Sequence, residues 1–143
     1  MAAWLVKEEP DAYPWERFAA EGRTAWTGVR NYGARLHLRA MKKGDPVVYY
    51  HTGRERAAVG LARVVREAYP DPTVDPGAQR RDWSAVDLEA QCPFPRPVPL
   101  SVLREDSRFR DCALLRQGRL SVLPLSEKEF QALLELAGLD GEA

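Results

Sequence analysis

The chain has 143 residues and few of the residues that small metal or disulfide sites need. It contains two cysteines and two histidines. Neither Cys92 nor Cys112 belongs to a CxxC pair, so the sequence predicts reduced cysteines and no metal site. No apolar run approaches the roughly 20 residues of a membrane-spanning helix. The N-terminus has no basic region before its apolar residues. We therefore expect a cytoplasmic protein without membrane, metal or cofactor.

Signatures of the common enzyme classes are also missing. The sequence contains no nucleophile elbow, no Walker loop and no cluster of metal ligands. A triad of His51, Ser121 and Asp71 can be written, but any chain of this length allows one. An enzyme could instead use Lys7 and Glu9 as base and acid. The sequence therefore favours a binding protein over an enzyme, with a protein-interaction module as a third alternative.

Charge is balanced over the whole chain but not along it. There are 21 basic and 21 acidic residues. The net charge is −3 over residues 1–22, +8 over residues 23–66 and −5 over residues 67–143. A contiguous basic third can attract a polyanion such as nucleic acid. The alternative is that the basic segment pairs with the acidic C-terminal half.

The order of expected elements predicts an α+β fold in a single domain over residues 1–143. Asn31 and Ser126 are good N-caps, and Gly22 and Gly138 are good helix ends. Helices are expected from these signals at 14–21, 32–41 and 127–137, with short helical turns at 101–104 and near Phe109. Strands are expected at 3–7, 47–51, 57–67, 83–90 and 116–123, with a loop at 69–77 and an extended edge segment at 93–99. Because the strands are grouped, the sheet should be curled and mostly antiparallel.

One strand face is unusually bare. Ala58, Gly60 and Ala62 alternate along the expected strand 57–67, so their side chains share one face of the sheet. Such a face lets a helix or a ligand approach the backbone closely.

Seven short blocks, in this order and spacing, resemble the EVE domain family. They are WLVKEEP at 4–10, WTGVRNY at 26–32, MKKGD at 41–45, YYH at 49–51, VGLA at 59–62, YPDPT at 69–73 and RQGRLSV at 116–122. The resemblance implies a PUA-like, curled β-barrel decorated with short helices. It also implies a reader of modified bases in DNA or RNA, with an aromatic-lined pocket. Related ASCH domains include amidohydrolases of modified nucleosides, which is the alternative function.

A base reader needs aromatic walls for stacking and a few polar groups for the base edge. We expect Trp26, Asn31, Tyr50 and His51 to converge on one pocket. The full set of expected pocket residues is Trp26, Val29, Asn31, Tyr49, Tyr50, His51, Leu120 and Ser121. The expected phosphate-binding face is Arg30, Arg35, Arg39, Lys42 and Lys43, and the expected rim is Lys7, Glu9, Pro10, Tyr69, Asp71 and Pro72.

Each of these residues also has a structural interpretation. Trp26 could belong to the core, Asn31 could serve as a helix cap, and His51 could be a satisfied structural histidine. The arginines and lysines could form an ordinary solvated surface. The residues leave open the base modification, the choice between DNA and RNA, and the oligomeric state.

Overall fold

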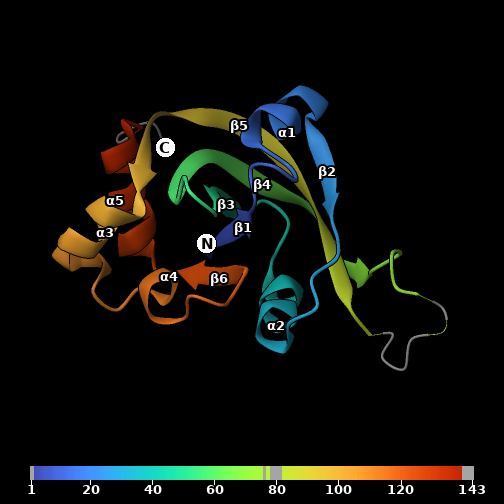
Figure 1. Cartoon of the computed structure of the whole chain (residues 1–143). Coiled ribbons are helices and arrows are strands. Elements are labelled where there is room, and N and C mark those ends of the chain that lie inside the picture. Colours follow the sequence, from blue (N-terminus) through green and yellow to red (C-terminus); the bar gives the residue numbers. More distant parts are fainter. Residues whose placement is uncertain (1, 76, 78–81, 140–143) are drawn as a thin grey trace.

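The computed structural model describes residues 2–75, 77 and 82–139. Its strands are β1 (Ala3–Glu8), β2 (Arg23–Trp26), β3 (Pro46–His51), β4 (Ala57–Pro70), β5 (Ser84–Pro99) and β6 (Val122–Leu125). Its helices are α1 (Trp15–Glu21), α2 (Tyr32–Ala40), α3 (Leu100–Glu105), the 3₁₀ helix η1 (Ser107–Phe109), α4 (Ala113–Arg116) and α5 (Glu127–Ala137). Figure 1 shows the helices distributed around a strongly curved sheet, which confirms the α+β class.

The strands form one sheet in the order β2-β5-β4-β3-β1-β6. The pairing of β1 with β3 is parallel, and the other pairings are antiparallel. The expected β-barrel is wrong, because β2 and β6 lie at opposite edges and the sheet is not closed. A closed barrel would require the edge strands β2 and β6 to pair. Helix α2 instead packs against β6, β4 and β5 (Figure 1).

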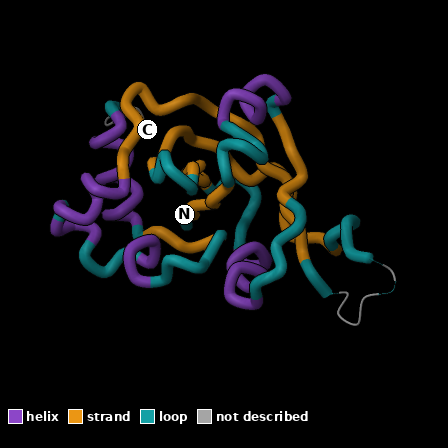
Figure 2. Tube along the Cα trace, viewed as in Figure 1, coloured by secondary structure: helices purple, strands orange, loops and turns teal. Residues whose placement is uncertain are grey.

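Helices cover both faces of the sheet (Figure 2). Each face has its own hydrophobic core. Val6 and Tyr49 point to one face, where they pack with residues of α1 and α2. Leu5 and Tyr50 point to the other face, where they pack with residues of α3, α4 and α5. This alternation follows from the two-residue period of a strand. The sheet therefore separates two sides of the molecule.

Gly60 on β4 receives an aromatic side chain from α1. A Cβ atom added to Gly60 would lie 2.5 Å from the Trp15 ring. Glycine at this position therefore lets the indole rest directly on the strand backbone. A helix thus approaches Gly60, as expected. The expectation that Ala58, Gly60 and Ala62 share one face is wrong, because the register shifts between Ala58 and Gly60 and Ala58 belongs to the core on the opposite face.

Most expected helices are confirmed by their caps. The Asn31 side chain accepts from Ala34 N at 3.0 Å, and Ser126 forms a capping box with Glu129. Gly22 and Gly138 end their helices with positive φ.

Several expected boundaries are wrong. Tyr69 and Pro70 belong to β4, so the loop begins at Asp71, and residue 76 of that loop lies outside the described residues. The segment 93–99 continues β5 and pairs with β4. Residues 113–116 form α4, so the last strand starts at Val122 and not near Arg116. The short strand β2 was not expected at all.

None of the helices formed by the described residues is both long and apolar enough to cross a membrane.

Candidate nucleic-acid interface

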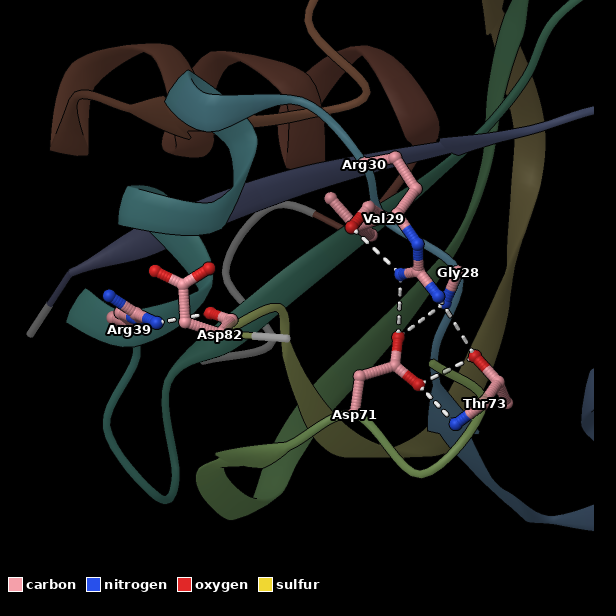
Figure 3. A network of polar contacts seen from close by, with 7 residues as sticks. All are labelled: Gly28, Val29, Arg30, Arg39, Asp71, Thr73 and Asp82. Atoms are coloured by element: carbon pink, nitrogen blue, oxygen red, sulfur yellow. Dashed lines mark hydrogen bonds and ion pairs between the residues drawn. The ribbon is translucent and has the colours of Figure 1, made fainter. Parts of the chain in front are cut away.

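The carboxylate of Asp71 organises the loop that follows β4 (Figure 3). Its side chain is fully buried. Oδ2 accepts hydrogen bonds from Gly28 N at 2.8 Å and Arg30 Nη1 at 2.9 Å, and Oδ1 accepts from Thr73 N and Oγ1 at 2.7 and 2.6 Å. Burial alone would raise the pKa of this carboxyl, but the hydrogen bonds from Thr73, Gly28 and Arg30 outweigh it and hold the pKa at about 2. Asp71 is therefore ionised and ties two segments together.

Glycine is required at position 28 for this contact. Gly28 has a φ of 80°, which L side chains rarely adopt. This conformation brings its amide to Asp71 and directs the chain into Arg30 and the first turn of α2. The Asp71 network therefore fixes the loop that carries Arg30.

Beside this network, arginines and aromatic rings lie against one another. The Arg30 guanidinium lies 5.8 Å from the Trp83 ring centroid, and the Arg35 guanidinium lies 5.5 Å from it. Arg35 also lies 4.8 Å from the Tyr32 ring, which is 5.7 Å from the Trp83 ring. The Tyr32 side chain is exposed. Flat π-faces beside guanidinium groups provide a surface on which a base can stack.

A hollow of about 400 Å³ adjoins these rings. It is lined by Arg39, Ala68, Tyr69, Pro70, Asp82, Trp83 and Ser84. Two contacts hold the Tyr69 side chain in place. Its hydroxyl donates to Asp87 Oδ1 at 2.5 Å, and the Arg66 guanidinium lies 3.7 Å from the ring centroid. Burial, followed by the bond to Asp87, raises the pKa of Tyr69 to about 12. We call Arg30, Tyr32, Arg35, Arg39, Tyr69 and Trp83 the arginine–aromatic surface.

Helix α2 presents two of these arginines to β5. Arg35 is largely buried and pairs with Asp82 at 2.6 Å, while its Nε has no hydrogen-bond partner within the described part of the chain. Arg39 donates from Nε to Ser84 Oγ at 2.9 Å and from Nη2 to the Asp82 carbonyl oxygen. The four-residue spacing from Asn31 therefore directs one row of α2 toward the start of β5.

The basic segment does pair with acidic residues later in the chain. Arg30 pairs with Asp71 and Arg35 with Asp82, as described above. Glu89 on β5 also holds both Arg23 and Arg63. The local charge of the segment is therefore partly neutralised in the fold. This arrangement matches the alternative that the sequence left open.

Four of the expected pocket residues lie in the core that α1 and α2 cover. Trp26, Val29, Tyr49 and His51 are all buried. The Trp26 and Tyr49 rings meet edge to face at 5.6 Å, and the Tyr49 hydroxyl donates to the Tyr13 carbonyl oxygen. His51 Nε2 accepts from Trp15 N at 3.0 Å, and its Nδ1 lies 3.0 Å from Glu55 Oε1. Both imidazole nitrogens thus face groups of the protein itself.

Tyr50 does not converge with Trp26. It is buried in the core on the opposite face of the sheet, beside α3 and α4. The expected convergence of Trp26, Asn31, Tyr50 and His51 on one pocket is therefore wrong, because neighbouring strand residues point to opposite faces.

A further group of expected residues meets near the first turn of α2. A Cβ atom on Gly33 would lie 3.0 Å from Leu120 Cδ2 and 3.3 Å from Asn31 Oδ1. The Ser121 carbonyl oxygen accepts from Lys7 N at 2.9 Å. Leu120 thus rests against α2, and the segment before β6 is attached to the end of β1.

The remaining expected residues lie outside the arginine–aromatic surface. Glu9 and Pro10 belong to the turn between β1 and α1. Lys42 and Lys43 are exposed just after α2, where their backbone amides donate to Asp45 and Glu67. Pro72 is exposed in the loop after Asp71.

The sequence interpretation missed Trp83 and Tyr32 as candidate binding residues. Trp83 lies just before β5 and Tyr32 begins α2. Both are aromatic residues with arginine nearby in the sequence, and aromatic residues interleaved with basic ones are typical of nucleic-acid surfaces. That pattern could have identified them.

No group of metal-ligating side chains is present in the described part of the chain.

Comparison with known proteins identifies a matching family. The EVE domain model matches residues 2–136. Human thymocyte nuclear protein 1 is 33% identical over 163 aligned positions, which cover 93% of this chain and 72% of that protein.

Solved structures agree with that match. A protein of Agrobacterium tumefaciens superposes with a TM-score of 0.93 and 36% identity, over 99% of this chain and 96% of that one. Human thymocyte nuclear protein 1 in complex with 5-methylcytosine-containing DNA superposes with a TM-score of 0.86 and 32% identity, over 96% and 98%. An ASCH protein of Zymomonas mobilis, at 14% identity and a TM-score of 0.56 over 94% and 97%, shares the fold alone.

Proposed function

The chain belongs to the EVE domain family, and we propose that it is a nucleic-acid-binding module that reads a modified base. The observation that carries this proposal is the arginine–aromatic surface, where exposed and half-buried rings lie among guanidinium groups beside a hollow. The human relative crystallised with 5-methylcytosine-containing DNA supports nucleic acid as the partner class.

The hollow has the chemistry that an extruded methylated cytosine needs. Trp83 offers a π-face for stacking. The Asp82 carboxylate can accept a hydrogen bond from the cytosine N4 amino group, and Ala68 and Pro70 offer apolar contact to a 5-methyl group. Extruding the base from a duplex costs a few kcal/mol, which contacts from arginine to the phosphates offset.

Binding, and not catalysis, is the activity that we assign. The fold shared with the ASCH protein carries no substrate with it, because folds host many functions. Arginine, aromatic rings and an ion-paired carboxylate at the hollow favour stacking and hydrogen bonding of a base.

The test is binding of fluorescent oligonucleotides with one central cytosine, 5-methylcytosine or N6-methyladenine, as single-stranded DNA, duplex DNA and RNA. We expect tighter binding of a modified strand than of its unmodified control. Trp83→Ala should lose about 1–3 kcal/mol of that binding, which is a factor of about 5 to 150. Leu36→Ala is the matched control, because Leu36 is an exposed apolar residue on α2.

Three outcomes would contradict the proposal. The first is equal binding of all modified and unmodified strands, and the second is an unchanged affinity in Trp83→Ala. The third is a change in the mass of a modified nucleoside after incubation with the protein, which would indicate an enzyme.

A further inference from the structure

A second cavity lies on the other face of the sheet, where α3 and α4 cover the ends of β1 and β3. Its volume is about 400 Å³. Lys7 from β1 and Tyr50 from β3 contribute to it and are direct neighbours in the parallel pairing of these strands. Arg56 reaches it from the turn before β4, and Arg104 reaches it from α3. The cavity belongs to the core side opposite to Trp26 and Tyr49.

The charges around this cavity have one sign. Lys7, Arg56 and Arg104 line it, and no carboxylate does. Within the described residues, none of these three cations takes part in an ion pair. This contrasts with Arg30 and Arg35, which have carboxylate partners. Three cations around one concave site attract an anion strongly, because the low-dielectric walls focus their field.

Two of the three cations are held in place by backbone carbonyl groups. Lys7 Nζ donates to the Gly118 oxygen at 2.9 Å, which uses one of the three ammonium donors. Arg56 Nε donates to the Gly53 oxygen at 3.2 Å, which leaves its two terminal amino groups. Burial of Lys7 lowers its pKa, as expected for a cation with no compensating anion nearby. Lys7 and Arg56 are therefore positioned and still have donors for a ligand.

The backbone at Arg56 is strained in a way that supports a role for this turn. Arg56 has a φ of 44°, and among the described residues it is the non-glycine residue with a positive φ. Its carbonyl oxygen accepts from Leu100 N at 2.8 Å, which joins the turn to the first residue of α3. Such conformations cluster at ligand sites.

The other walls suit a flat organic group. Leu100, Leu114 and Leu115 line the cavity, together with Tyr50. Tyr50, Arg56 and Arg104 line the same cavity. Burial raises the pKa of Tyr50, while the charges of Arg56 and Arg104 act in the opposite direction. The lining therefore offers cationic groups to a phosphate and apolar side chains to a base or sugar.

We propose that this cavity binds a nucleoside monophosphate group, with its phosphate held by Lys7, Arg56 and Arg104. The volume lies within the range of roughly 300–1,000 Å³ that is typical of small-molecule sites. The chemistry is a phosphate monoester on a nucleoside, from a free nucleotide or from the 5′ end of a strand. This site is independent of the arginine–aromatic surface, since it lies on the other face of the sheet.

The test is a titration of the ¹⁵N-labelled protein with deoxycytidine monophosphate, deoxycytidine or inorganic phosphate. We expect saturable shifts of the Gly53 and Gly118 amides with the monophosphate and weaker binding of the other two compounds. Arg104→Gln should weaken the monophosphate about tenfold, as expected for a lost charge-assisted bond. Arg110→Gln is the matched control, because Arg110 is also exposed but does not line the cavity.

Arg56→Asn serves as a second variant, because asparagine tolerates positive φ. Equal binding of deoxycytidine and its monophosphate, shifts centred on Gly28 and Gly33, or unchanged affinity in both variants would overturn the proposal. Competition by a 5′-phosphorylated oligonucleotide but not by its 5′-hydroxyl counterpart would assign the site to strand ends. Binding of the monophosphate that neither oligonucleotide competes with would assign the site to free nucleotides.

Discussion

Two aromatic clusters of this protein differ in their exposure to water. The cluster around Tyr49 contains Trp15, Phe18 and Trp26 and is dry. The cluster around Trp83 contains Tyr32 and is surrounded by arginines, with one ring half exposed. Rings that already pack against rings on every side stabilise the fold. Rings that pack against guanidinium groups at the surface can exchange part of that contact for a base.

The largest effect is expected in the dry cluster. Trp26→Ala should lower the free energy of unfolding by about 3–5 kcal/mol, because it removes a buried indole and leaves a cavity. Trp83→Ala should change it far less. Urea unfolding of both variants measures the difference. A Trp26→Ala protein that keeps its full stability but loses oligonucleotide binding would reverse the roles assigned to the two clusters.

A smaller effect is expected at Asp71, which anchors the loop beside the cluster around Trp83. In Asp71→Asn an amide group faces the donors of Gly28, Arg30 or Thr73, so we expect a loss of about 2 kcal/mol of stability at pH 7. The folded-state pKa of about 2 lies below the ordinary 3.8. This contribution is therefore complete above about pH 5 and declines as the pH falls toward 2.

Urea unfolding at pH 7, 5 and 3.5 checks the prediction. The stability difference between the wild type and Asp71→Asn should shrink at the lowest pH. Asp75→Asn, in the same loop but exposed, is the control and should show no such trend. A difference that stays constant over this pH range would mean that Asp71 acts through shape and not through its charge.

The two clusters also show what the sequence can and cannot predict. Asn31, Gly22 and Ser126 were correctly assigned because a cap depends on residues within one turn. Trp26 and Trp83 are chemically identical, and only long-range packing decides that Trp26 is buried under Tyr49 and Trp83 is not. The expected role of Trp26 in binding rested on residue type and on the family resemblance, and neither of these indicates burial.

The covering of the two sheet faces was a second feature that the sequence could not predict. The alternation of Tyr49 and Tyr50 was predictable, but the sequence did not indicate that helices cover both faces. The four-residue strand β2 is too short for a clear period, and α4 forms where Leu114 packs into the core. The pairing of Arg30 with Asp71 joins positions 41 residues apart, which charge counting cannot resolve.

The smallest effect, and the one that sharpens the comparison most, is expected at Arg39. In the part of the chain that the structure describes, its guanidinium is bonded to Ser84 Oγ and to a carbonyl oxygen, which are neutral partners, whereas Arg30 and Arg35 are paired with carboxylates. An arginine without a compensating charge contributes most to phosphate binding, because it releases a counterion from the nucleic acid. Arg39→Gln should therefore weaken all oligonucleotides alike and reduce the slope of log K against log salt by about one. Lys128→Gln, an exposed change on α5, is the control and should leave the slope unchanged. Fluorescence anisotropy at several salt concentrations measures both. An unchanged slope in Arg39→Gln would place the phosphate contacts elsewhere, while a loss confined to modified strands would make Arg39 a base contact.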